Sequence, residues 1–130
     1  MKGFVAVGLW MVLVAPTMGR DRLFDAIVKI ESRGNPDAVG DEGNAHGLVQ
    51  AWRRAWQDGC KTLGVHWNYG TGVRDPRKCI RIFYAYTSRY GARTDQQRAR
   101  IWNGGPDGEH DRYTLSYWFK VRRVMKRMKT

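Results

Sequence analysis

One glycine-rich stretch interrupts a chain that otherwise has the periodicity of short helices. Residues 37–49 contain Gly40, Gly43 and Gly47 among polar side chains, a composition typical of a turn region or a small hairpin. On both sides of this stretch apolar residues recur at helical spacing, and glycine or proline ends each run after a few turns. We therefore expect a mainly α domain of the α+β class, with the glycine-rich turn or short β-hairpin beside the helices.

Cap residues predict where the individual helices begin. Asp75 before Pro76 is an N-cap followed by proline at the first helical position, and Thr94 with Gln97 fits a capping box. Thr114 is the expected N-cap of the last helix. The sequence predicts a loop over residues 61–74 and helices over residues 21–33, 50–58, 76–90, 95–102 and 115–129.

The first nineteen residues have the composition of an export signal. Lys2 provides a positive start, residues 4–14 are an apolar run too short to span a bilayer comfortably, and residues 16–19 include small and helix-breaking residues suited to cleavage. A membrane anchor or a buried helix is the alternative. We expect a signal peptide over residues 1–19, a single domain over residues 20–130, and a secreted or periplasmic protein.

The chain is strongly basic, with a formal net charge of +11. Removal of residues 1–19 would leave about +10, because that segment holds one lysine and no acid. Such a charge favours a polyanionic partner, and export favours an anionic cell wall over nucleic acid, for which no recognition motif is present. Much of the charge lies on the polar face of the last predicted helix, at Lys120, Arg122, Arg123, Lys126, Arg127 and Lys129.

Cys60 and Cys79 are the two cysteines of the chain. In an exported protein an even pair predicts one disulfide, which would add about 3 kcal/mol to stability. The alternative is two buried free thiols. No CxxC motif or Cys/His cluster occurs, so we expect neither a metal site nor a cofactor.

Glu31 is the first candidate for chemistry, because a helix would place it on the same face as Ile27 and Phe24. Partial removal from water disfavours the charged form of its carboxyl group and raises its pKa. Such a carboxyl group stays protonated near neutral pH and can donate its proton to a leaving oxygen. The alternative is a solvated glutamate, although the negative end of the helix dipole makes that position slightly unfavourable.

A second carboxylate is available in the glycine-rich stretch, at Asp37, Asp41 or Glu42. Asp41 stands between Gly40 and Glu42, where backbone amides can approach it and stabilise its ionised form. A protonated and an ionised carboxyl group facing one another is the pair that glycoside hydrolysis requires. A turn-forming aspartate is the alternative, and the residues alone do not choose among the three candidates.

Sugar substrates bind to flat apolar faces and amide groups, and the chain offers both. Five of its six tryptophans lie beyond residue 19. We expect Trp56 and Trp118 to be buried, Trp52 or Trp102 to lie nearer a cleft, and His46 to have a structural or substrate-contact role. Candidates for hydrogen bonds to sugar hydroxyl and N-acetyl groups are Gln50, Asn103, Gly104 and Gly105.

Several segments resemble, in order, the motifs of the invertebrate-type lysozymes, the destabilase family, and their bacterial relatives. ESRGNPDAVGDEGNAHGLVQ resembles the catalytic segment of that family, and its E-S-x-x-N-P and G-x-x-Q pattern also occurs in the wider lysozyme and soluble-transglycosylase superfamily. The further matches cover most of residues 24–122 and are AWQDGC, CIRIFYAYTSRYG, ARIWNGGPDG and TLSYWFKV.

The resemblance implies roles for particular residues. Glu31 matches the general acid, Asp41 the second catalytic carboxylate, and Gln50 a residue beside the cleft. Tyr86 matches the tyrosine of the central helix, and residues 103–106 match the N-G-G-P loop. The implied reaction is hydrolysis, with retention, of the β-1,4 bond between N-acetylmuramic acid and N-acetylglucosamine. The chain departs from the animal members in its few cysteines, a turn one residue shorter, and Trp102 where many members have histidine.

The leading hypothesis is therefore a secreted muramidase with a lysozyme-like domain, acting on peptidoglycan or a chitin-like oligosaccharide. One alternative is a lytic transglycosylase that uses Glu31 alone. Another is a non-enzymatic cationic protein that binds cell walls or membranes through its last helix. We expect a monomer whose other partner is an anionic cell-wall surface, without specific binding of nucleic acid.

Overall fold

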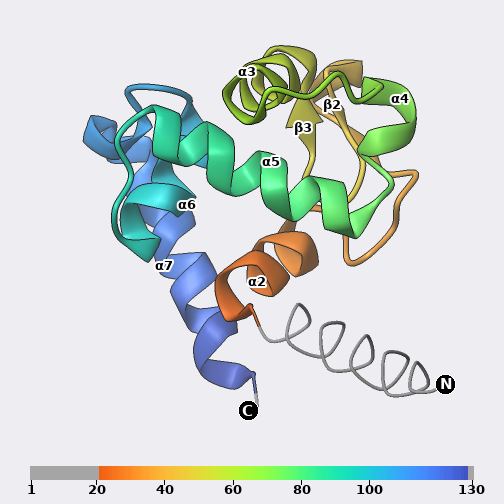
Figure 1. Ribbon diagram of the computed structural model, residues 1–130. Helices are drawn as coiled ribbons and strands as arrows, with labels where there is room; N and C mark the ends of the chain where they lie inside the picture. The colour runs from red at the N-terminus through yellow and green to blue at the C-terminus, as the bar shows by residue number, and fades with distance from the viewer. Residues whose placement is uncertain (1–20, 129–130) are drawn as a thin grey trace, which may run out of the picture.

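The computed structural model describes residues 21–128, which form helices around one small antiparallel sheet. This is the α+β arrangement that the sequence predicts. The signal peptide expected over residues 1–19 lies outside the described residues. The elements in chain order are α2 (Arg22–Glu31), β1 (Val39–Gly40), η1 (Asp41–Gly43), β2 (Ala45–His46), β3 (Ala51–Trp52), α3 (Arg53–Leu63), α4 (Tyr69–Gly72), α5 (Pro76–Arg89), α6 (Asp95–Gly104), η2 (Gly108–His110) and α7 (Arg112–Arg127) (Figure 1).

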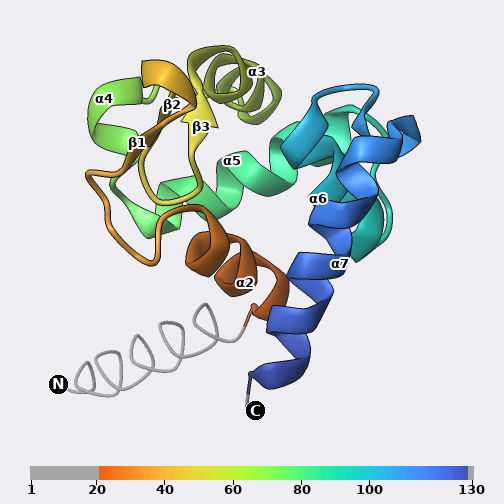
Figure 2. The same ribbon diagram turned by 180° about the vertical axis from the view of Figure 1, so that it is seen from behind.

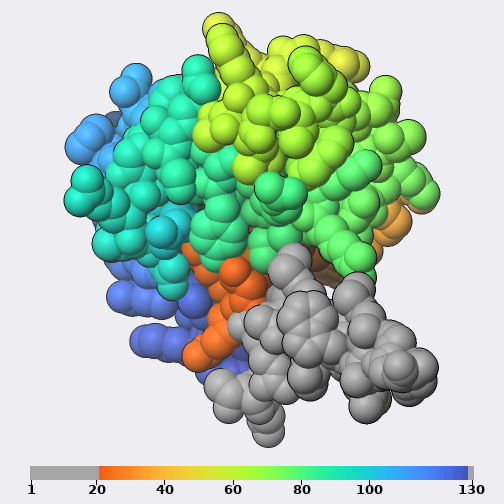
Figure 3. All heavy atoms as spheres, viewed as in Figure 1, coloured from red at the N-terminus to blue at the C-terminus, as the bar shows by residue number. Residues whose placement is uncertain are grey.

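Helix α5 runs through the middle of the molecule (Figures 1 and 2). The sheet and α3 lie on one side of it and α2 on the other, while α6 and α7 lie near its C-terminal end. Figure 3 shows the side chains of α5 against those of α3 and α6. Within residues 21–128, no helix combines the length and the apolar character needed to cross a membrane.

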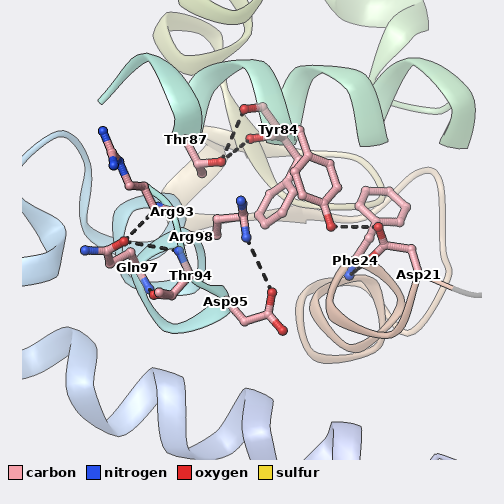
Figure 4. Close-up of polar contacts among 10 residues, drawn as sticks. Asp21, Phe24, Tyr84, Thr87, Arg93, Thr94, Asp95, Gln97 and Arg98 are labelled. Atoms are coloured by element: carbon pink, nitrogen blue, oxygen red, sulfur yellow. Dashed lines mark hydrogen bonds and ion pairs between the residues drawn. The ribbon is translucent and has the colours of Figure 1, made fainter. Parts of the chain in front are cut away.

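Side-chain caps hold the starts of α2 and α6 (Figure 4). Asp21 caps α2: its Oδ1 accepts the Phe24 backbone N–H at 2.8 Å, and its Oδ2 accepts the Tyr84 hydroxyl of α5 at 2.6 Å. Helix α6 begins with the predicted capping box, because Thr94 Oγ1 accepts the Gln97 N–H and Gln97 Oε1 accepts the Thr94 N–H, both at 3.1 Å. These caps satisfy amides that the helices leave unpaired.

Helix α7 begins earlier than predicted, whereas Asp75 caps α5 as expected. The N-cap of α7 is Asp111, whose Oδ1 accepts the Tyr113 N–H at 2.8 Å. The prediction that Thr114 caps this helix is wrong. Thr114 is buried in the first turn, and its hydroxyl donates to the Gly108 carbonyl at 2.5 Å.

Ala51 and Trp52 form a strand, so the helix predicted over residues 50–58 starts later than expected. Strand β3 pairs with β2 and holds Trp52 in an extended conformation, with φ −79° and ψ 152°. Trp52 and Trp56 therefore do not share a helix face: Trp52 is 49% exposed and Trp56 is 1% exposed. The loop predicted over residues 61–74 contains the end of α3 and all of α4.

Glycines allow two close approaches around the core. Trp56 and Trp118 are buried as predicted, and a Cβ on Gly72 would lie 2.2 Å from the Trp56 ring. Gly47 has φ 82°, and a Cβ there would lie 2.2 Å from the Val73 carbonyl oxygen. The lack of a side chain at Gly47 lets the hairpin approach the loop before α5, and the lack of one at Gly72 lets α4 pack against Trp56 of α3.

The predicted disulfide between Cys60 and Cys79 is wrong, since both residues are buried free thiols. The two sulfurs have separate partners. Cys60 Sγ lies 3.8 Å from the Trp67 carbonyl oxygen, and Cys79 Sγ lies 3.4 Å from the Val73 carbonyl oxygen. Stability must therefore come from packing, because no covalent bond links α3 to α5 through these residues.

We expect neither thiol to react with a maleimide in the native protein, and both to react after unfolding in guanidinium. Burial, with a smaller contribution from Asp75, raises the pKa of Cys79 to about 12, so its reactive thiolate is scarce. Mass spectrometry before and after unfolding would count the labelled cysteines. If the protein, unfolded without a reducing agent, contained no reactive thiols, the result would support a disulfide between Cys60 and Cys79.

Candidate active site

A cavity of about 350 Å³ lies between the sheet and α3 on one side and the end of α6 on the other. Figure 2 shows these elements facing one another, with α5 between them. Two residues that the sequence did not single out for the site also line the cavity, Arg54 and Ala55, together with Pro106 of the N-G-G-P loop. The lining includes seven of the nine predicted catalytic or substrate-binding residues, namely Asp41, Gln50, Tyr86, Trp102, Asn103, Gly104 and Gly105.

Glu31 is not part of the cavity lining, but it lies within the electrostatic reach of Asp41. It is the last residue of α2 and is half-buried. The next residue, Ser32, ends the helix, and its hydroxyl donates to the Leu48 carbonyl at 2.7 Å. Burial raises the pKa of Glu31, and the charge of Asp41 raises it further. A hydrogen bond from Tyr117 and the charge of Lys120 act in the opposite direction. The predicted rise in pKa is therefore present, with burial as its main cause.

Tyr117 is the partner of Glu31 that sequence reasoning missed. Its hydroxyl donates to Glu31 Oε2 at 2.7 Å, from α7 to the end of α2. Tyr117 is 8% exposed, and burial followed by the charge of Glu31 raises its pKa well above the ordinary value. It remains a neutral donor that fixes one oxygen of the carboxyl group. Its segment, TLSYWFKV, carried part of the family resemblance, but no local pattern links residues this far apart in the chain.

Asp41 is the carboxylate of the glycine-rich stretch that lines the cavity. It is exposed, and its Oδ2 accepts the Trp52 indole N–H at 3.1 Å, whereas the sequence had suggested backbone amides as its partners. Asp41 and Glu42 have φ of 49° and 57°, a left-handed geometry that costs energy in non-glycine residues. Of the other two candidates, Asp37 forms an ion pair with Arg74, and Glu42 does not line the cavity.

Gln50 lies at the edge of the cavity and hydrogen-bonds the hairpin. Its Nε2 donates to the carbonyl oxygens of Ala38 and Gly47, each at 3.0 Å. Its Oε1 lies so close to Gly40 that a Cβ there would be 2.4 Å away. Gln50 thus connects both ends of the hairpin, and its free acceptor faces the residue that precedes Asp41.

His46 lies in β2, outside the cavity. Its Nε2 is 2.8 Å from the Gly43 carbonyl oxygen, and its ring packs edge-on against Tyr69, with ring centroids 5.7 Å apart. These contacts support the structural interpretation of His46 rather than a direct contact with a ligand in this cavity.

Aromatic side chains form one wall of the cavity. Trp102 donates its indole N–H to the Val49 carbonyl at 2.9 Å and packs edge-on against Tyr86, with centroids 5.6 Å apart. Burial raises the pKa of Tyr86 to about 12, and neighbouring Tyr90 and Asp58 contribute to the rise. Tyr86 is therefore a neutral hydroxyl donor and acceptor near neutral pH.

The loop after α6 forms the polar rim opposite the hairpin. Asn103 and Gly104 are exposed, and Gly105 has φ 89°. A Cβ on Gly104 would lie 2.5 Å from the Thr114 methyl group, so the loop packs closely on α7. Amide groups here can hydrogen-bond a polar ligand in the cavity.

The site therefore combines a carboxyl group of raised pKa, an exposed carboxylate, aromatic faces and amide groups. These are the components for acid-assisted cleavage of a bond between sugars. Across residues 21–128, no three His, Cys, Asp or Glu side chains are grouped to hold a metal ion.

The α+β fold of residues 21–128 is shared with solved lysozyme structures. The Tapes japonica lysozyme structure is similar, with a TM-score of 0.66 and 24% identity, over 84% of this chain and 94% of that chain. A chain in the crystal structure of Aeromonas hydrophila PliI in complex with Meretrix lusoria lysozyme is also similar, with a TM-score of 0.70 and 22% identity, over 80% and 88% of the two chains. No family model and no curated protein sequence matches. The similarity confirms the lysozyme-like fold that the sequence predicts.

Proposed function

We propose that this chain is an invertebrate-type lysozyme that hydrolyses the β-1,4 bond between N-acetylmuramic acid and N-acetylglucosamine in peptidoglycan. The observation that carries the proposal is Glu31, a half-buried carboxyl group whose pKa is raised by burial and by the charge of Asp41. A raised pKa lets the carboxyl group keep its proton to higher pH than a solvated glutamate does, which is what a general acid requires. The fold shared with solved lysozymes supports the same reading.

In the proposed reaction, Glu31 transfers its proton to the glycosidic oxygen as the bond to the anomeric carbon breaks. Tyr117 donates to Oε2, so the transferable proton sits on Oε1. Asp41 stabilises the positive charge on the anomeric carbon or attacks it, and water then completes hydrolysis. The indole of Trp52, which hydrogen-bonds Asp41 Oδ2, orients that carboxylate.

The cavity walls supply the contacts that would hold a sugar chain. Trp102 and Tyr86 offer apolar faces for sugar rings, and Trp52 offers a third at the hairpin. Amide groups of Asn103 and the following glycines would hydrogen-bond N-acetyl and hydroxyl groups.

The basic surface of α7 would bring the enzyme to an anionic cell wall. The five basic residues on this surface form no ion pair within the described part of the chain, so their charge is available to a polyanion. We propose that the protein acts outside the cytoplasm as a monomer, after removal of its signal peptide. The surface consists of Lys120, Arg122, Arg123, Lys126 and Arg127.

The purified protein should release fragments with reducing ends from peptidoglycan. Water is the final acceptor when Asp41 takes part, whereas an enzyme using Glu31 alone would form an anhydro sugar by internal attack. Mass spectrometry separates the two, because the anhydro product is lighter by one water. Detection of anhydro products would indicate a lytic transglycosylase reaction in place of hydrolysis. Clearing of cell walls without release of sugars would favour a non-enzymatic cationic protein.

A further inference from the structure

Arg54 is the one cation among the described residues that line the active-site cavity. Asp41 is the one acid in the same lining, and the other side chains there are neutral. A ligand that enters the cavity therefore meets one fixed positive charge, in addition to the carboxylate assigned to the reaction. The chemistry proposed for Glu31 and Asp41 does not use Arg54.

Arg54 forms no ion pair within residues 21–128. The ion pairs in this part of the chain are Arg74 with Asp37 and Arg98 with Asp95. Asp58, one turn further along α3, accepts the Tyr90 hydroxyl at 2.7 Å and forms no ion pair with Arg54. The guanidinium group of Arg54 thus has its donors available for a ligand.

The position of Arg54 is also unfavourable for its own helix. It lies in the first turn of α3, which contains no acidic residue, and the N-terminal end of a helix dipole is positive. A cation there weakens the helix slightly, so stability of α3 does not explain why arginine occupies this position.

We propose that Arg54 is a specificity-determining residue that binds a carboxylate of the glycan, so that the cleft favours acidic muramyl glycans over neutral chitin-like ones. The inference rests on the proposed function and names the substrate class of the same site. A guanidinium group is charged at every relevant pH, and its planar fork matches a carboxylate in a bidentate hydrogen bond. Chitin-like oligosaccharides carry no group that could form this contact.

The carboxylate can come from two parts of a peptidoglycan strand. In a strand without peptides the lactyl group of N-acetylmuramic acid carries it. In a strand with stem peptides the lactyl carboxyl group is an amide, and the carboxylates lie on the peptide. Both sources present the same chemistry to Arg54, and substrates of each kind distinguish them.

Arg53 provides a matched control. It precedes Arg54 in the same helical turn, but its guanidinium carbon lies 4.6 Å from the Tyr69 ring centroid and it lines a different cavity. Replacing either arginine by glutamine removes one positive charge from the same part of the surface. A difference between the two variants therefore measures the effect of the arginine that lines the cavity, and not the effect of net charge.

The experiment measures dissociation constants by calorimetry in a Glu31→Gln background, where ligands are not consumed. Three ligands of equal length are compared. The first is an N-acetylglucosamine oligomer, the second is a peptide-free strand in which N-acetylglucosamine alternates with N-acetylmuramic acid, and the third is the same strand with stem peptides. We expect Arg54→Gln to weaken binding of the carboxylate-bearing strands about tenfold and of the neutral oligomer less than about twofold. Arg54→Lys should recover part of the loss, and Arg53→Gln should weaken all three ligands equally or not at all.

The pattern across ligands decides the outcome. A loss with peptide-free strands assigns the contact to the lactyl carboxylate, and a loss only with peptide-bearing strands assigns it to the stem peptide. Equal loss on all ligands, no loss, or the same selectivity change in Arg53→Gln would overturn the proposal. Selective binding by a parent protein that releases no sugar would refute the hydrolase proposal while leaving the role of Arg54 intact. The melting temperature of Arg54→Gln should not fall, because the substitution removes a first-turn cation.

Discussion

Replacement of Glu31 by glutamine should lower the rate of sugar release from peptidoglycan by about 10²–10⁴-fold, the range that a general acid contributes. Glutamine has the shape of glutamate but holds no transferable proton. Its amide oxygen can still accept the Tyr117 hydroxyl, which lies 2.7 Å from Glu31 Oε2, so the link between α2 and α7 should survive. The loss would therefore be one of chemistry and not of folding.

The measurement is a reducing-end assay on purified peptidoglycan, with the melting temperature followed in parallel. Glu42→Gln is the matched control, because Glu42 is exposed, lies next to Asp41 and does not line the cavity. This control should retain nearly the parent rate. A Glu31→Gln protein that releases sugars like its parent would exclude Glu31 as the acid, and one that still clears whole cells would show that the basic surface acts without catalysis.

The position of Glu31 could be predicted from sequence because it depends on local geometry. Helical spacing alone places it on the apolar face of α2, and burial follows from that face packing on the core. Tyr117 could not be predicted in the same way. Its contact with Glu31 depends on how α7 crosses α2, and neither helix contains a local pattern that fixes that crossing. Sequence reasoning therefore missed Tyr117, the residue whose side chain hydrogen-bonds Glu31.

Two of the errors in the fold share a cause, which is that contacts distant in sequence override what the local sequence suggests. Trp52 has helical spacing to Trp56, but pairing of β3 with β2 holds it in a strand. Cys60 and Cys79 suggest a disulfide by number and compartment, yet each thiol faces its own carbonyl oxygen. By contrast, the capping box at Thr94 was predicted correctly because all its hydrogen bonds lie within a few residues.

Arg54 was overlooked for another reason. A single arginine at the start of a helix has no motif, and the basic composition of the chain makes any one cation unremarkable. The folded structure distinguishes the two arginines, because Arg54 lines this cavity whereas Arg53 lies over the Tyr69 ring and lines another. The charge selectivity that we propose for this site would therefore depend on the folded hairpin and α6 as well as on α3, and could not be predicted from the α3 sequence alone.

Replacement of Asp41 by asparagine should lower hydrolysis by about 10²–10³-fold, the cost of removing one group that stabilises charge in the transition state. Asparagine keeps an oxygen that can accept the Trp52 indole N–H, so the hairpin should retain its shape. Asp37→Asn is the matched control, since Asp37 pairs with Arg74 and does not line the cavity. A parent-like rate in Asp41→Asn, with anhydro products, would favour a reaction that uses Glu31 alone.

The same substitution should move the pKa of Glu31 in a defined direction. The negative charge of Asp41 disfavours ionisation of Glu31, so its removal should lower that pKa. The alkaline limb of the pH profile, where the acid loses its proton, should then shift to lower pH. Tyr117→Phe should do the opposite, because the lost hydrogen bond had favoured the carboxylate and its removal raises the pKa.

Carbon-13 NMR of the glutamate carboxyl groups would follow the Glu31 titration in both variants, whatever activity remains. Opposite shifts for Asp41→Asn and Tyr117→Phe would show that the two groups act on Glu31 as the geometry requires. Shifts in one direction for both would mean that changes in burial dominate, because burial is the largest cause of the raised pKa of Glu31. In that case the raised pKa of Glu31 would result mainly from the packing of α2, and Asp41 would act on the sugar without affecting the Glu31 titration.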